Sequence, residues 1–203
     1  MGSDHSKYDR TIRPQNPLII AIDSRFVMSH QVTLVMNSKF WTGDFHVKDS
    51  KTEAIYFKTN KTTSFGFSRK KMLFDHYDKP IANFKHRSHA YDVYRGQSSD
   101  DHAFRIEEEY SYTRYKLSAA IDNQATGQRL VLYVRGDSES VYIFNGHPKQ
   151  GGQAIASVSR NGFFESTGYT LCVASGVDLA MVVFLVMAFH EARESNHRQI
   201  MDD

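Results

Sequence analysis

SGVDLAMVVFLVMAFHEAR, residues 175–193, contains the longest apolar run of the chain, the eleven consecutive apolar residues 179–189. The length of this run, its lack of Gly and Pro, and its Leu, Ala and Met content favour a helix over a strand. Ser175 and Asp178 have the spacing of a capping box, and His190 follows where a cation stabilises a helix C-terminus. The sequence therefore predicts a helix across this stretch.

This helix is too short to cross a membrane. The thirteen residues 177–189 cover about 20 Å at a rise of about 1.5 Å per residue, whereas the hydrocarbon layer is about 30 Å thick. An interfacial helix needs one polar face, and residues 179–189 are apolar on every side. We therefore expect the helix to be enclosed by protein. The side chains that we expect to fill the interior around it are Leu179, Met181, Val182, Val183, Phe184, Leu185, Val186, Met187 and Phe189.

The rest of the chain has the pattern of antiparallel strands. Short runs rich in Val, Ile, Tyr, Phe and Thr recur between turn-forming residues, at 33–37, 45–49, 54–58, 64–67, 71–75, 80–85, 91–95, 103–110, 115–121, 129–135, 140–145, 153–159 and 169–174. A flat open sheet of this size would leave two long unpaired edges, which favours a barrel or a sandwich. Because one helix must be surrounded, we predict a mainly β fold, a closed antiparallel β-barrel of about twelve strands around the C-terminal helix.

Length and composition fit a single domain. The chain has 203 residues, 40% of them hydrophobic, and a net charge of +2 that gives no reason to expect a nucleic-acid partner. We divide it into a flexible N-terminal segment, residues 1–16, which can be lipidated, a barrel domain, residues 17–195, and a polar tail, residues 196–203. The first thirty residues lack the pattern of a secretory signal, so we expect a cytoplasmic protein.

The single cysteine, Cys172, excludes an intrachain disulfide framework and a zinc site built from several thiolates. It lies in the alternating run YTLCVA, where we expect it to be a small core residue. A reducing compartment is consistent with this cysteine usage.

Five segments carry a family resemblance: TLVMNSKF (33–40), FHVKDSKTEAIYFK (45–58), SFGFSRKKMLFDHYDKPIANFK (64–85), AYDVYRG (90–96) and GYTLCVASGVDLAMVVFLVMAFHE (168–191). Through them the chain resembles the LURP-one-related family, which has the tubby C-terminal-like fold shared distantly with phospholipid scramblases. The resemblance implies a twelve-stranded barrel wound around the terminal helix. No catalytic residues are established for the family, so none is transferred, and scrambling activity is not carried over to a chain with one cysteine.

Basic residues are concentrated in one part of the sequence. Residues 51–90 contain nine Lys or Arg against three acids, a balance of +6 that leaves −4 for the remainder. Such a segment can attract anionic phospholipid head groups at about 1 kcal/mol per basic residue, and tubby-like domains bind phosphoinositides. The residues we assign to this lipid contact are Arg69, Lys70, Lys71, Lys85 and Arg87; the alternative is that they solvate the outer barrel surface.

The N-terminus, MGSDHSK, fits the N-myristoylation pattern, with Gly2 as the acceptor and Ser6 four positions later. A chance match or a cloning remnant would give the same letters. One myristoyl chain anchors a protein only marginally, so a basic surface would be the second signal that it needs.

No pattern indicates a metal, a cofactor or an active site. His86 and His89 are three residues apart, which on a strand sends their rings to opposite faces, and His76 with them completes no four-ligand shell. No nucleophile elbow, His-Glu-x-x-His or phosphate-loop motif is present in the sequence. We therefore expect a non-enzymatic protein without a cofactor.

Two functions remain open. The first is a peripheral membrane or phosphoinositide-binding adaptor at the cytoplasmic face of a membrane. The second is a protein-interaction scaffold in a signalling or defence pathway that does not bind lipid, with partners that the sequence does not identify. Carriage of a small molecule inside the barrel conflicts with a helix that already fills it.

Overall fold

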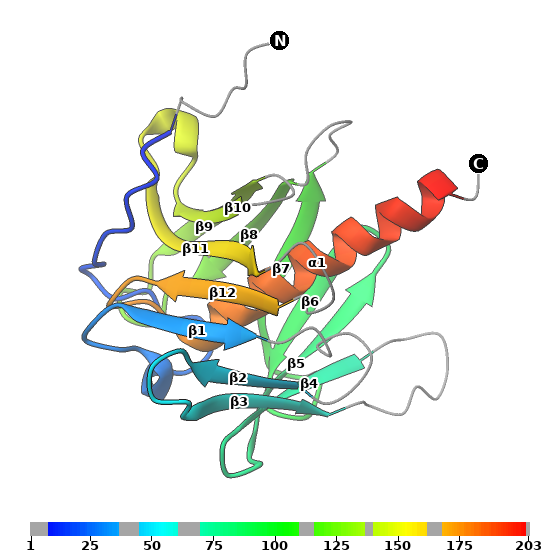
Figure 1. The fold of residues 1–203 in the computed structure, drawn as a ribbon, viewed down its shortest axis with the longest axis horizontal. Helices are drawn as coiled ribbons and strands as arrows, with labels where there is room; N and C mark the ends of the chain where they lie inside the picture. The colour runs from blue at the N-terminus through cyan, green and yellow to red at the C-terminus, as the bar shows by residue number, and fades with distance from the viewer. Residues whose placement is uncertain are drawn as a thin grey trace.

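The computed structural model describes residues 8–36, 45–60, 70–109, 116–136, 140–161 and 168–201. Twelve antiparallel strands close into one barrel, in which each strand pairs with its neighbours along the chain and β1 pairs with β12 (Figure 1). The strands are β1 (Val32–Met36), β2 (Phe45–Asp49), β3 (Ile55–Asn60), β4 (Lys70–Asp75), β5 (Pro80–Arg87), β6 (Ala90–Arg95), β7 (His102–Glu109), β8 (Lys116–Asp122), β9 (Arg129–Gly136), β10 (Ser140–Asn145), β11 (Gln153–Asn161) and β12 (Gly168–Val173). The predicted closed barrel is confirmed.

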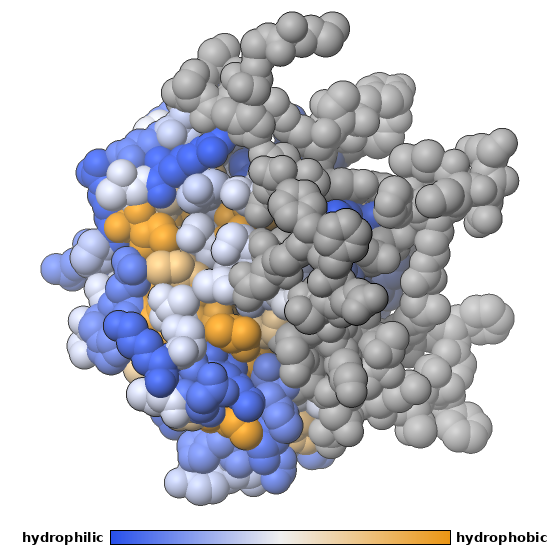
Figure 2. Space-filling view, viewed as in Figure 1, coloured by the Kyte–Doolittle hydropathy of each residue, from blue (hydrophilic) through white to orange (hydrophobic). Residues whose placement is uncertain are grey.

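Alternating side chains make the inner and outer surfaces of the barrel. In β1 the buried residues are Val32, Leu34 and Met36, and the residues between them are half-buried. Because successive side chains of a strand point to opposite faces, this pattern directs one set inward and the other outward. On the described part of the face in Figure 2, hydrophobic residues reach the surface only in small patches bordered by hydrophilic ones.

The helix α1 (Leu179–Met201) starts inside the barrel and leaves it at one end (Figure 1). Residues 179–189 are each at most 3% exposed, including all nine residues expected to fill the barrel. Phe184 stacks on the inward ring of Phe84, with the ring centroids 5.9 Å apart. Among the described residues, none belongs to a helix with the length and hydropathy required to cross a membrane.

The ends of α1 differ from the prediction. Asp178, rather than Ser175, caps the helix, because its Oδ1 accepts from the backbone N–H groups of Ala180 and Met181 at 3.0 and 3.3 Å. At the other end the helix continues past residue 193 to Met201, beyond the barrel and into the segment expected to be a polar tail. The capping box is therefore wrong, and the helix is shifted toward the C-terminus.

Residues 8–31, here called the strap, cover the end of the barrel where α1 begins (Figure 1). The backbone N–H of Gln15 donates to the carbonyl of Ser175 at 3.0 Å, and Ile19 forms a parallel bridge with Val177. Directly after β8, Asn123 accepts from the N–H of Ile20 at 2.9 Å through its Oδ1. The described part of the chain also contains two short 3₁₀ helices, Ser24–Phe26 in the strap and Pro148–Gln150 between β10 and β11.

Two sequence-based expectations concern single segments. Cys172 is half-buried on β12, between the fully buried Leu171 and Val173, so it lies on the outer face and the core assignment is wrong. The predicted strand at 64–67 lies outside the described residues.

Candidate functional site

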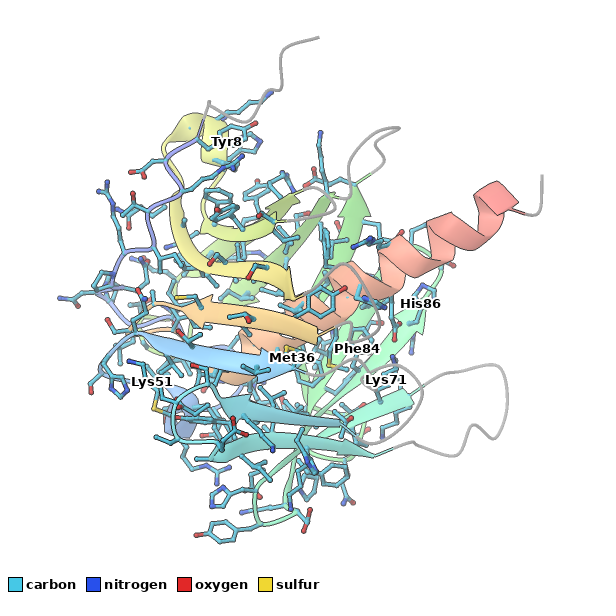
Figure 3. All side chains as sticks on the ribbon, in the orientation of Figure 1. Tyr8, Met36, Lys51, Lys71, Phe84 and His86 are labelled. Carbon is cyan, nitrogen blue, oxygen red and sulfur yellow. The ribbon has the colours of Figure 1, made fainter. Side chains whose placement is uncertain are left out.

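The basic residues of the segment 51–90 do not gather on one face. Lys51 lies in the turn between β2 and β3, at the end of the barrel covered by the strap, whereas Lys71 lies near the end from which α1 emerges (Figure 3). Lys58 is engaged elsewhere, with its Nζ 2.9 Å from Oδ1 of Asp78. The hairpins carry the chain back and forth between both ends of the barrel, and this separates charges that are close in sequence.

Lys70 and Lys71 point to opposite sides of β4. Lys71 pairs across the strands with Phe84, which is 1% exposed and faces the interior, and the Lys71 ammonium binds the carboxylate of Glu191 on α1. Lys71 therefore joins the barrel to its helix. The predicted lipid contact requires Lys70 and Lys71 to lie on one surface, and they do not.

Lys70 and Lys85 lie side by side on the outer face of β4 and β5, as a register pair. The Nζ of Lys70 donates to the carbonyl oxygen of Gln97, and the Nζ of Lys85 donates to Oγ of Ser99. The Lys85 Nζ also lies 5.5 Å from the centroid of the Tyr94 ring. Burial lowers the pKa of Lys70, and the charge of Lys85 lowers it further.

The next outward position across the sheet is an acid surrounded by basic side chains. Asp92, whose side chain is 7% exposed, pairs in register with Lys85 on one side and with Arg105 on the other. Its carboxylate lies 3.3 Å from Arg87 Nε, 3.8 Å from Arg105 Nε and 3.5 Å from His102 Nε2. We call the outer surface made by these side chains the cationic face: Lys70, Lys85, Arg87, Asp92, His102 and Arg105.

Asn83 holds a loop over this region. Its side chain is fully buried, and its Nδ2 donates to the carbonyl oxygens of Gly96 at 3.0 Å and Ser98 at 2.7 Å. Within the described part of the chain, Oδ1 of Asn83 is the buried side-chain atom that lacks a hydrogen-bond partner. Residues 96–101, here called the β6–β7 loop, are thus fixed against the outer face of β4 to β6.

A hollow adjoins the cationic face. It lies over β7, β8 and β9, because the outward residues of β8, Ser118 and Ala120, are smaller than the side chains on either side of them. His102 and Arg105 belong to both the hollow and the cationic face, and Arg129 lines the hollow's other wall. A ligand whose charged group binds the cationic face could place a neighbouring group in this hollow.

His102 and Arg105 were missed by the sequence analysis. Both follow residue 90 and so fall outside the segment 51–90, in which the charge excess was counted. Arg105 occupies an outward position of an alternating strand, where its neighbours Phe104 and Ile106 are buried. That alternation is visible in the sequence, but only the register between β6 and β7 places Arg105 beside Asp92.

The three histidines that the sequence analysis weighed as metal ligands, His76, His86 and His89, lie apart. The His76 ring contacts the Tyr77 ring at a tilt in the β4–β5 turn, with centroids 3.8 Å apart, whereas His86 stacks on Tyr91 at the opposite end of β5, at 4.7 Å. His89 Nδ1 lies 3.8 Å from Oε2 of Glu108. Across the described ranges, no three His, Cys, Asp or Glu side chains form a group that could hold a metal ion.

Polar groups close the end of the barrel from which α1 emerges. The Tyr169 hydroxyl and His190 Nδ1 are 2.7 Å apart and buried. The Tyr91 hydroxyl donates to Oε1 of Glu108 at 2.9 Å. Burial raises the pKa of Tyr91, as does the neighbouring Glu108 carboxylate, so the phenol remains a protonated donor.

Two of the predicted site residues, Gly2 and Arg69, lie outside the described residues.

Comparisons with known proteins agree with this architecture. The family model for LURP-one-related proteins matches residues 30–190. An X-ray structure of an Arabidopsis thaliana protein is similar with a TM-score of 0.66 and 20% identity, over 86% of this chain and 98% of that chain, which is a likeness of fold. No curated protein matches the sequence. Because the family model spans most of the chain, from before β1 into α1, this protein belongs to the LURP-one-related family.

Proposed function

We propose that the chain is a non-enzymatic cytoplasmic adaptor that binds anionic phospholipid head groups, phosphoinositides among them, at the cationic face. The observation that carries this proposal is the pairing of Lys70 with Lys85 across β4 and β5. Each ammonium group donates to an uncharged acceptor, Lys70 to the Gln97 carbonyl and Lys85 to the Ser99 hydroxyl. A phosphate group can replace such acceptors and gain charge-assisted hydrogen bonds.

The cationic face alone attracts a membrane only weakly. Each Lys or Arg near an anionic membrane contributes about 1 kcal/mol, and the Asp92 carboxylate offsets about one of the four cations. A net gain of roughly 3 kcal/mol corresponds to a dissociation constant above about 1 mM, which is too weak for stable attachment. The proposal therefore includes a second anchor, a myristoyl chain on Gly2, with an association constant on the order of 10⁴ M⁻¹ by itself.

Vesicle sedimentation tests the proposal. Vesicles of phosphatidylcholine with and without phosphatidylinositol bisphosphate are mixed with the full chain and with two charge-reversal variants. Lys70→Glu with Lys85→Glu should lose binding to the charged vesicles, because it reverses the central pair. Lys51→Glu with Lys58→Glu makes the same change in net charge away from the cationic face and should keep most of the binding. Lys51 lies at the strap end of the barrel, and Lys58 binds Asp78 in the β4–β5 turn, next to the contact of Asp75 with Arg25 of the strap. Equal losses in both double variants would contradict a localised site.

An interaction scaffold is the second candidate, and one residue favours it. Tyr77, in the β4–β5 turn, is 80% exposed, and tyrosine is enriched among residues that dominate protein interfaces. It lies at the far end of β5 from Arg87, so a protein bound there would leave the cationic face open. Partner capture that persists in detergent and falls in Tyr77→Ala would support this function, whereas capture that needs lipid would support the first.

A further inference from the structure

The β6–β7 loop has the sequence Gly-Gln-Ser-Ser-Asp-Asp and lies on the surface. Ser98 and Asp100 are exposed, and Ser99 between them is half-buried. Two acids directly follow Ser99. Serine followed by acids is complementary to a kinase whose peptide groove is basic, because such a groove attracts the acids and orients the hydroxyl.

The Ser99 hydroxyl is already positioned beside the lysine pair. Its Oγ accepts from Nζ of Lys85, and two residues earlier in the loop the Gln97 carbonyl accepts from Nζ of Lys70. Asn83 holds the loop in this place through the carbonyls of Gly96 and Ser98. A group attached to Ser99 Oγ would therefore lie next to Lys85. Lys70, which binds the same loop two residues earlier, is the neighbouring cation.

We propose that Ser99 is a phosphorylation site for an acid-directed serine kinase, and that its phosphate occupies the cationic face and blocks the head-group site. The effect on lipid binding rests on the proposed function, but the modification and its contact with Lys85 do not.

The reaction is an ordinary phosphoryl transfer from ATP. The Ser99 Oγ attacks the γ-phosphorus of Mg-ATP, the new Oγ–P bond forms, and the bond between the γ-phosphorus and the oxygen bridging to the β-phosphate breaks. ADP leaves with that oxygen. The hydroxyl proton passes to the catalytic base of the kinase.

The loop can accept the added charge. A phosphoserine carries about −1.5 to −2 charges at neutral pH and forms one to three charge-assisted hydrogen bonds beside basic groups. Of the two following acids, Asp101 is already paired, because its Oδ1 lies 2.7 Å from Nη1 of Arg95. Asp100 is exposed, where solvent screens its repulsion. Attraction to Lys85 and Lys70 therefore exceeds repulsion within the loop.

The expected size of the effect follows from the two neutralised lysines. Each contributes about fivefold to the affinity for an anionic membrane, so phosphorylation of Ser99 should weaken vesicle binding about 25-fold. The loss should equal that of Lys70→Gln with Lys85→Gln, and phosphorylation of that double variant should have little further effect.

The experiment uses the full chain, a purified acid-directed serine kinase and Mg-ATP. Fragment mass spectrometry locates the phosphate, and vesicle sedimentation measures binding before and after the reaction. Ser98→Ala should remain a substrate, whereas Ser99→Ala should lose the modification and the inhibition. As a readout without lipid, NMR of the lysine side chains should show Lys85 Nζ shift on phosphorylation of Ser99, while Lys58 Nζ at the strap end should not.

The outcomes separate the two proposals. A phosphate on Ser99 that shifts the Lys85 signal supports the site even if unmodified protein does not bind vesicles, and in that case the proposed function fails alone. Phosphate found on Ser98 but not Ser99, no phosphorylation, or a Lys85 signal that stays unchanged would each overturn the inference. Vesicle binding that is unaffected by phosphate on Ser99 would overturn its blocking role.

Discussion

Asp178 and Ile22 are 156 residues apart in the chain, yet Oδ2 of Asp178 accepts from the backbone N–H of Ile22 at 2.7 Å. The same carboxylate accepts from four more backbone N–H groups, those of Ala21, Asp23, Ala180 and Met181. Burial raises the pKa of Asp178, and the N–H donors act against that rise. One fully buried side chain thus caps the barrel-filling helix and fixes the strap across the end of the barrel.

Asp178→Asn should destabilise the protein strongly. Both carboxylate oxygens of Asp178 accept from backbone N–H groups. An amide keeps one of these acceptors but replaces the other with an NH₂ group, whose N–H donors would face backbone N–H donors. We expect the free energy of unfolding to fall by about 3 kcal/mol, as for a broken buried charged network. Urea unfolding followed by circular dichroism measures it. Asp122→Asn changes a carboxylate that is 76% exposed and should cost less than about 0.5 kcal/mol.

Gly176→Ala tests how closely the strap approaches the residues that precede α1. Gly176 has φ +80°, and a Cβ there would lie 2.3 Å from the carbonyl oxygen of Gln15. Gly127 is the matched control, since its φ is +71° but a Cβ would meet no atom within 4 Å. Gly127→Ala should cost about 1 kcal/mol from backbone strain alone, and Gly176→Ala about 2 kcal/mol more. Thermal unfolding compares them; equal shifts would show that the strap yields easily.

Val183→Asp should abolish folding rather than a binding activity. Val183 is fully buried inside the barrel, where an unpaired carboxylate costs about 5 kcal/mol, comparable to the whole stability of a small domain. Val131→Asp introduces the same group on the outer surface, at a residue that is 38% exposed. Expression yield and gel filtration should give aggregated Val183→Asp and monodisperse Val131→Asp. A soluble, folded Val183→Asp protein would contradict an enclosed helix.

The barrel and its helix were predictable because each is set by a property of the sequence itself. A run of apolar residues too short for a bilayer and apolar on all sides has to be enclosed, and the alternating runs supply the strands. The ends of α1 were not predictable in this way. The backbones of Ser175 and Gly176 form hydrogen bonds with the strap, and Asp178 caps the helix instead. At the other end, the helix continues to Met201, past the apolar run from which it was predicted.

The candidate site was less predictable, because charge along the chain does not reveal which side chains share a face. Lys70 and Lys71 are adjacent in sequence but lie on opposite sides of β4. The partner of each residue also depends on irregular pairing, with register shifts at Leu73/Phe74 and Val93/Tyr94. Such shifts move every later side chain relative to the neighbouring strand, so Arg105 could not be placed beside Asp92 by counting.

Lys85→Gln should raise the pKa of Lys70. Burial and the Lys85 charge both lower that pKa from its ordinary value of 10.5, and the variant removes the second cause. In the wild type, Lys70 therefore holds its proton less in the folded state than in the unfolded chain just below pH 10.5. Its contribution to the free energy of unfolding rises with pH through that window. The rise should be smaller in Lys85→Gln. NMR titration of the lysine side chains measures the pKa directly, and Lys58→Gln, at the strap end, should leave Lys70 unchanged.

Gly2→Ala should move the protein from membranes to the soluble fraction of eukaryotic cells. If Gly2 is myristoylated, the acyl chain and the cationic face multiply their affinities, and removing the chain leaves the roughly 3 kcal/mol of the basic residues, too little for attachment. Ser3→Ala keeps both Gly2 and Ser6 and should retain the modification. Intact mass of the native N-terminus decides whether the acyl chain is present. An unmodified Gly2 in a protein that still sediments with membranes would assign the attachment to the cationic face, or to a protein partner, without a lipid anchor.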